Sequence, residues 1–110
     1  MHNLLPTILA DIAGAMKHLN RISSEIGVYD VCSDLKLFHD STQANLCDSG
    51  DYITPSAIAG MEEPIVDFES IVRNEILFRA KGLYSQHCAI QATDCLNEAL
   101  EKVRLAKNDA

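Results

Sequence analysis

The chain has 110 residues, of which 47% are hydrophobic and 23% charged, and it carries a formal net charge of −7. This length fits one domain with a core of its own, so we treat residues 1–110 as a single domain that needs no disulfide or metal to fold. The acidic balance is the opposite of the basic footprint that phosphate-backbone binding requires, so we predict no nucleic-acid partner.

The compartment is predicted from the N-terminus and the cysteines. The apolar stretch from Leu4 to Ala15 is interrupted by Asp11 and is too short to span a bilayer. It also lacks the positive region that opens a secretory signal. The four cysteines, at positions 32, 47, 88 and 95, do not have the spacing of a small secreted scaffold. We therefore expect a cytoplasmic protein with reduced thiols and no membrane partner.

Apolar residues at alternating steps of three and four predict a first helix over residues 4–27. Pro6 suits the first turn of a helix, and Gly27 is a suitable stop. The spacing keeps the 3.5-residue period of helices that wrap around one another. We call its main apolar positions the first-helix seam: Leu5, Ile8, Ile12, Leu19, Ile22 and Ile26. Part of this seam should pack against the chain's own helices, and it is the candidate surface for a second copy.

A second helix is predicted over residues 30–47. Asp30 is a good N-cap, and Val31, Leu35 and Phe38 have the spacing of an inward-facing stripe. The run of small polar residues at 48–51 predicts a loop. Thr54-Pro55 then has the pattern of an N-cap followed by proline at the first helical position, which predicts one or two turns ended by Gly60.

The remaining chain is predicted to form two helices, over residues 64–81 and 84–106. Two apolar stripes lie on opposite sides of one hypothetical continuous helix, which favours a break at Gly82 with Ser85 as the next N-cap. The first stripe is Ile65, Phe68, Val72, Ile76 and Leu83, and the second is Cys88, Ala92, Cys95, Leu96, Ala99, Val103 and Ala106. One long helix is the alternative. The whole pattern predicts an all-α antiparallel bundle of about four helices.

Residues able to do chemistry do not form a recognisable motif. Cys88 and Cys95 share a helix face but lie about 10 Å apart along the axis, too far to share one zinc without other ligands. His87 points about 100° away from Cys88. We therefore predict no catalytic residue, no metal and no cofactor, and we read both cysteines as small core residues. His18, His87, Cys88 and Cys95 are kept as an alternative site.

His18 also supports a comparison with a known class of domain. An acidic four-helix chain with the run His18-Leu19-Asn20-Arg21-Ile22 resembles the histidine phosphotransfer domains of bacterial signalling. Those domains carry an exposed histidine followed by lysine and glycine. This chain offers Arg21 but no glycine, and its histidine falls in the first helix. The resemblance implies a phosphoryl-accepting role for His18.

These sequence features support three candidate functions, which we give in order of preference. The leading one is a small interaction module (an adaptor, a regulator or a chaperone-like bundle) that acts by protein–protein contact as a homodimer and is not an enzyme. The first alternative is a cysteine-based metal or redox sensor. The second alternative is phosphotransfer through His18.

Overall fold

The computed structural model describes residues 4–47 and 55–108 and is 86% helical. Its elements are, in chain order, α1 (Leu5–Asn20), α2 (Val28–Cys47), α3 (Pro55–Ala59), α4 (Glu62–Ile71), the π-helical segment η1 (Val72–Leu77) and α5 (Leu83–Asn108). No strand occurs in the described ranges. The predicted all-α antiparallel bundle is confirmed.

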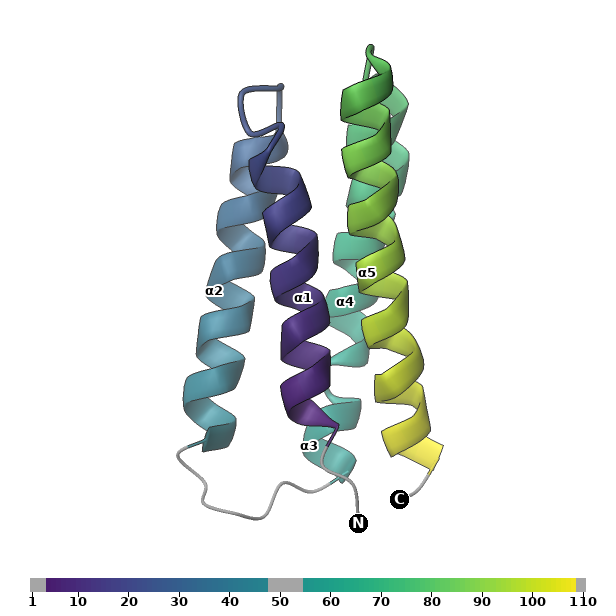
Figure 1. Cartoon of the computed structure of the whole chain (residues 1–110). Helices are drawn as coiled ribbons and strands as arrows, with labels where there is room; N and C mark the ends of the chain where they lie inside the picture. The colour runs from purple at the N-terminus through teal and green to yellow at the C-terminus, as the bar shows by residue number, and fades with distance from the viewer. Residues whose placement is uncertain (1–3, 48–54, 109–110) are drawn as a thin grey trace.

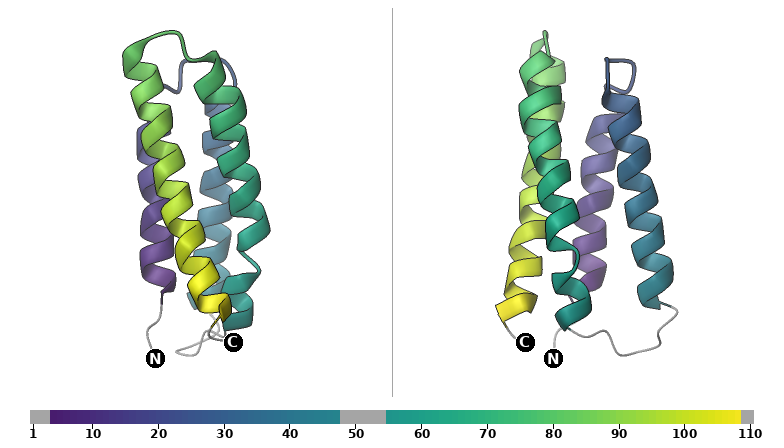
Figure 2. Two further views of the ribbon diagram at one scale, coloured as in Figure 1. Left: turned by 90° about the vertical axis from the view of Figure 1, so that its right-hand side faces the viewer. Right: turned by 180° about the vertical axis from the view of Figure 1, so that it is seen from behind.

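The long segments run alternately up and down the bundle (Figure 1). The α1 and α5 pair forms its centre, with α2 packed on α1, and α4 and η1 packed on α5. The short helix α3 packs on the lower part of α5. Helices α2 and α4 touch in few places, where the rings of Phe38 and Phe68 lie 5.8 Å apart. Figure 2 shows the result from two further sides: one pair of helices, α4–η1 with α5, stands beside the other, α1 with α2.

The core is built from the predicted apolar stripes and lies mainly between α1 and α5. On α5 the buried face consists largely of small residues, which lets α1 approach closely. Gly14 of α1 contributes to this approach, because a Cβ atom there would lie 3.3 Å from Cys95 Sγ. Residues that are fully buried include Ile8, Ile12, Ala15, Leu19, Leu35, Ile65, Val72, Ala89, Ala92, Leu96, Ala99 and Val103.

The first helix is shorter than predicted. The prediction of 4–27 is wrong at its C-terminal end, since α1 stops at Asn20 and residues 21–27 form successive turns. In these turns Ile22 N–H donates to Leu19 and Glu25 N–H donates to Ile22, bonds that span three residues instead of four. Apolar residues spaced by three suit such turns as well as they suit a helix, so the spacing did not reveal the change.

Helix α2 starts two residues before the predicted Asp30. Gly27 has φ +82°, a left-handed conformation that glycine adopts without strain, and it redirects the chain at this point. Val28 then opens the helix and is buried. The predicted loop at 48–51 and the predicted cap at Thr54 lie outside the described residues. The short helix α3 and its end before Gly60 agree with the prediction.

The chain does break at Gly82, so the alternative of one continuous helix is wrong. Residues 80–82 are not helical, and α4 with η1 and α5 lie side by side. The predicted N-cap is wrong: α5 begins at Leu83, and Ser85 Oγ donates instead to the Glu25 carboxylate. The Gln86 side-chain amide closes the turn: its Nε2 donates to the Ala80 carbonyl, 3.2 Å away. The first predicted helix of this pair, 64–81, starts earlier at Glu62, and the second, 84–106, extends to Asn108.

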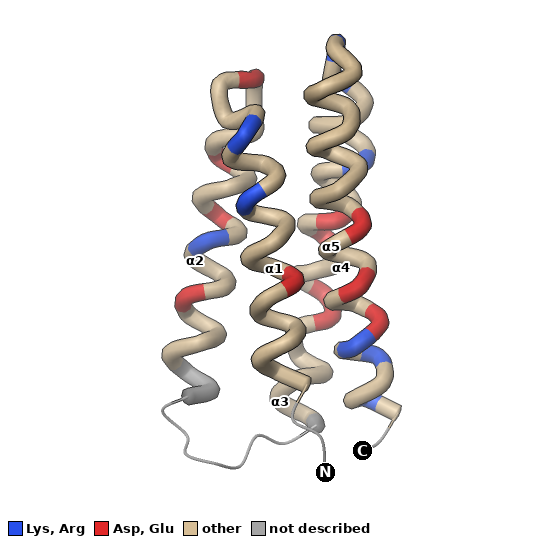
Figure 3. The backbone as a smooth tube through the Cα atoms, viewed as in Figure 1, with Lys and Arg blue, Asp and Glu red and all other residues tan. Residues whose placement is uncertain are grey.

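Ion pairs join the helices in the lower part of the bundle, where Figure 3 marks acidic and basic positions on neighbouring helices. Lys102 Nζ lies 2.6 Å from Asp11 Oδ2, which joins α5 to α1. Arg104 and Lys107 both donate to the Glu62 carboxylate, at 2.9 and 3.2 Å. These two hydrogen bonds, the one from Arg104 first, lower the pKa of the Glu62 carboxyl. The cations near the C-terminus are therefore paired with carboxylates of this chain.

Candidate functional site

The first-helix seam lies mostly inside the chain's own core. Leu5, Ile8, Ile12, Leu19 and Ile22 are all at most 3% exposed, and the exception is Ile26, which is 85% exposed in the turn after α1. A partner could reach the five buried residues only by opening the bundle. A surface for another molecule must therefore be sought elsewhere.

The alternative site is only partly brought together. His18 on α1 and His87 on α5 lie close enough for the charge of one to affect the other. Cys88 is buried, and Cys95 is partly buried against Gly14. Within the described residues no hydrogen bond joins any two of these four side chains. In the same ranges, no three histidine, cysteine, aspartate or glutamate side chains are placed to hold a metal ion.

The described thiols do not have the surroundings of reactive cysteines. Burial raises the pKa of the Cys32 thiol, and Lys36 opposes this shift. Burial also raises the pKa of the Cys95 thiol, with Glu98, Asp11 and Asp94 acting in the same direction. A raised pKa disfavours the thiolate, which is the nucleophile and the metal ligand. Cys32 Sγ instead lies 3.0 Å from the Asn20 side-chain oxygen, so it ties α2 to the end of α1.

His18 is partly buried at the α1–α5 interface. Its Nδ1 atom is enclosed and has no hydrogen-bond partner among the described residues, and the same holds for Oε1 of Gln91 on the facing helix. Burial lowers the pKa of His18, and the charges of Arg21, Lys17 and His87 lower it further. Protonation of His18 is therefore less favourable in the folded state than in the unfolded chain.

This shift predicts a pH dependence of stability. The unfolded chain binds a proton at position 18 from about pH 6.5 downward, while the folded chain binds it only at lower pH. The free energy of unfolding should thus fall as the pH drops below about 6.5, and His18→Gln should reduce this fall. Urea unfolding at pH 7.5 and 5.5 measures both. His87→Gln, which removes only the smallest of these contributions to the lowered pKa, should leave most of the fall. Equal pH dependence in wild type and His18→Gln would refute the assignment.

A group of exposed apolar residues lies on the outer face of α5 and at the end of η1. We call it the outer patch: Phe78, Leu83, Tyr84 and Ile90, which are between 46% and 86% exposed. Its direction follows from helix geometry. Ser85 faces the α1–α2 connection, and Leu83 and Ile90 lie about 160° and 140° around the helix from it. Leu83 and Ile90 therefore face away from α1 and α2.

Phe78 faces the same way, because it lies about 160° around its helix from Ile76, whose side chain points toward the α1–α2 connection. Three of the four patch residues lie in a segment of α5 without charged residues. From Leu83 to Thr93 the chain contains no Asp, Glu, Lys or Arg, although charged residues make up 23% of the whole. In Figure 3 the upper part of α5 correspondingly shows neither the blue of Lys and Arg nor the red of Asp and Glu. Sequence reasoning missed this surface because it assigned Leu83 to a buried stripe; the uncharged run was the signal that could have found it.

Comparisons with known proteins found no relative: no protein-family model, no curated protein and no solved structure matches the chain. None of the helices in residues 4–47 and 55–108 combines the length and the apolar character that crossing a membrane requires.

Proposed function

We propose that this chain is a non-enzymatic protein–protein interaction module that forms a homodimer through the outer patch. The observation that carries the proposal is the exposure of four large apolar side chains at the end of the bundle where η1 meets α5. Three of them lie in the segment Leu83–Thr93, which has no charged residue. Covering such side chains removes apolar surface from water at about 25 cal/mol per Å². A grouped exposed apolar surface of this kind is typical of a contact site.

The charge distribution favours a second copy as the partner. Two molecules that each carry −7 repel one another, so a self-contact is most favourable where acidic residues are missing. The segment from Leu83 to Thr93 meets this condition. In a two-fold dimer this surface would meet itself, since the same residues form the interface in both copies. A standard interface buries about 800 Å² on each partner, so contacts would extend from the outer patch along α5 and η1.

Sedimentation velocity from about 10 to 500 μM tests the proposal. We expect a dimer that dissociates on dilution, and Phe78→Ser/Leu83→Ser should weaken the dimer about 100-fold or more, because four apolar side chains are removed from the assembled interface. Tyr29→Ser/Leu37→Ser is the matched control, since it removes two other side chains that are more than half exposed, both on α2 and away from α5 and η1. A monomer at every concentration, or equal weakening by both double variants, would contradict the proposal.

The two alternative functions have less support. The raised pKa of Cys32 and Cys95 and the burial of Cys88 oppose a thiol sensor. The partial burial of His18, whose Nδ1 atom is enclosed, opposes a phosphoryl acceptor, which must be accessible to its donor. The cytoplasmic location predicted from the sequence remains part of the proposal, and fractionation of cells that express a tagged chain would test it.

A further inference from the structure

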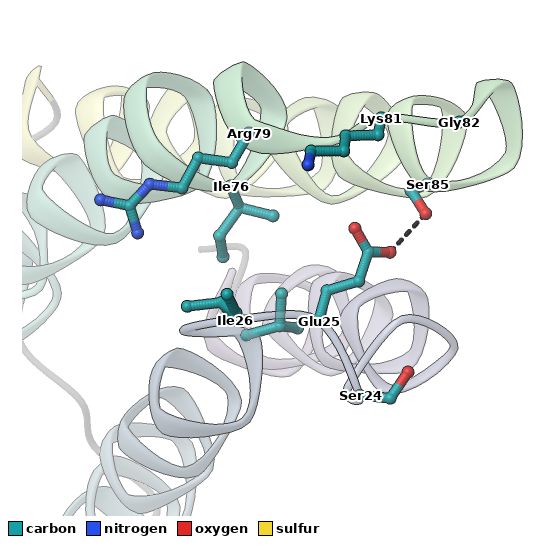
Figure 4. Close-up of a pocket in the computed structure, with 9 residues that line it drawn as sticks. Ser24, Glu25, Ile26, Ile76, Arg79, Lys81, Gly82 and Ser85 are labelled. Carbon is teal, nitrogen blue, oxygen red and sulfur yellow. Dashed lines mark hydrogen bonds between the residues drawn. The ribbon is translucent and has the colours of Figure 1, made fainter.

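A cleft of about 640 Å³ lies at the upper end of the bundle, between the α1–α2 connection and the turn that joins η1 to α5 (Figure 4). Its volume falls in the range of small-molecule sites, about 300–1,000 Å³. It is separate from the outer patch, because Ile76 and Ser85 turn toward the cleft while Phe78 and Leu83 face the other side of the same helices.

The walls of the cleft are largely apolar. Val28 from the start of α2 and Ile76 from η1 line it with side chains that also belong to the core. Ile26 stands at the cleft with most of its side chain in water. A ligand with an apolar group would remove the Ile26 side chain from water without any change in the fold.

Two cations at the cleft have no partner in the described part of the chain. Arg79 and Lys81 are exposed and form no ion pair or hydrogen bond there, unlike Lys102, Arg104 and Lys107 at the other end. Figure 4 shows both side chains extending along the cleft near Ile76. The nearest Arg79 guanidinium nitrogen is 4.0 Å from where a Cβ atom on Gly27 would lie, which places this charge beside the α1–α2 connection.

The carboxylate at the cleft is already engaged. Glu25 accepts a hydrogen bond from Ser85 Oγ and is directed toward the first turn of α5 (Figure 4). With two cations and one anion, the lining residues carry a net charge of +1 in a protein whose total is −7. Helices α2 and α5 begin at this end of the bundle, and α1 and η1 end there, so the helix dipoles largely cancel and the attraction for an anion comes from Arg79 and Lys81.

We propose that the cleft binds a small amphiphilic anion, in which one carboxylate is attached to a short aliphatic or aromatic group. The Arg79 guanidinium can pair with a carboxylate through two parallel hydrogen bonds, and the Lys81 ammonium can add a third. The apolar group then lies against Ile26, Val28 and Ile76. A single ligand charge matches the net +1 of the lining, whereas a polyphosphate would require more cations.

Titration of the ¹⁵N-labelled full-length protein with octanoate tests this, with octanol and octylamine as neutral and cationic analogues of the same chain length. We expect saturable shifts at the Ile26 and Gly82 amides with octanoate and binding at least tenfold weaker with the two analogues. Arg79→Gln/Lys81→Gln should weaken octanoate binding about tenfold or more, through the loss of charge-assisted hydrogen bonds. Lys17→Gln/Lys36→Gln has the same net charge and should bind like the wild type.

Octylamine binding as tight as octanoate binding, the absence of saturable shifts, or equal losses in both double variants would overturn the proposal. Should a variant fail to fold, the analogue series on the wild type still decides the outcome. Octanoate binding by Phe78→Ser/Leu83→Ser separates this site from the dimer: retained binding in a monomer supports the cleft alone, and loss of binding in that variant would show that the cleft depends on the dimer and is not the independent site proposed here.

Discussion

Ile12→Ala should lower the free energy of unfolding by about 2–5 kcal/mol. Ile12 is 0% exposed and belongs to the central core between α1 and α5, where the neighbouring side chains are mostly fixed in helices and can close a cavity only in part. The loss has two parts, the transfer of fewer apolar atoms out of water and the cavity that remains. Because a domain of this size is stabilised by only about 5–15 kcal/mol, this one change removes a large share of the total.

Chemical denaturation followed by circular dichroism measures this effect. Leu37→Ala is the matched control: it also shortens an aliphatic residue within a long helix, but Leu37 is mostly exposed on α2. We expect a change of about 0.5 kcal/mol or less for that variant. Similar losses in the two variants would mean that Ile12 is not in the core, and the arrangement of α1 and α5 would then be wrong.

Gly14→Val should destabilise the bundle by about 1–3 kcal/mol, although valine has the higher helix propensity. A Cβ atom at position 14 would already lie 3.3 Å from Cys95 Sγ, and the two methyl groups of valine need further space between α1 and α5. The helices must then separate or Cys95 must leave its position, and either change loosens the small-residue packing of the interface.

A double-mutant cycle identifies the cause of this loss. Cys95→Ala removes the sulfur atom that the new side chain would meet, so the loss from Gly14→Val should be smaller in the Cys95→Ala background by about 0.5 kcal/mol or more. Gly82→Val is the control glycine, because no atom lies within 4 Å of a Cβ at that position. A valine at 82 that destabilises as much as one at 14, or additive losses in the cycle, would show that close approach of α1 and α5 is not the reason.

The surfaces proposed for function could be predicted from the sequence only in part. The uncharged segment Leu83–Thr93 is visible in the sequence, but its apolar residues have the same composition as a buried stripe. Which of them face water depends on the side of α5 that α1 covers. The cleft is less predictable still, because Ile26, Ile76 and Arg79 come from segments about fifty residues apart in the chain. No local pattern places them together.

The spacing of apolar residues was sufficient to predict the all-α class and the break at Gly82, and the Thr54-Pro55 pattern predicted the short helix before Gly60. These features depend on backbone preferences and on one-sided burial, which act over a few residues and are written in local sequence. The end of α1 at Asn20 and the exposure of Ile26 and Leu83 were decided by tertiary structure. The physical reason is that an apolar side chain is buried only if another element covers it, and the pairing of α1 with α5 left those side chains uncovered.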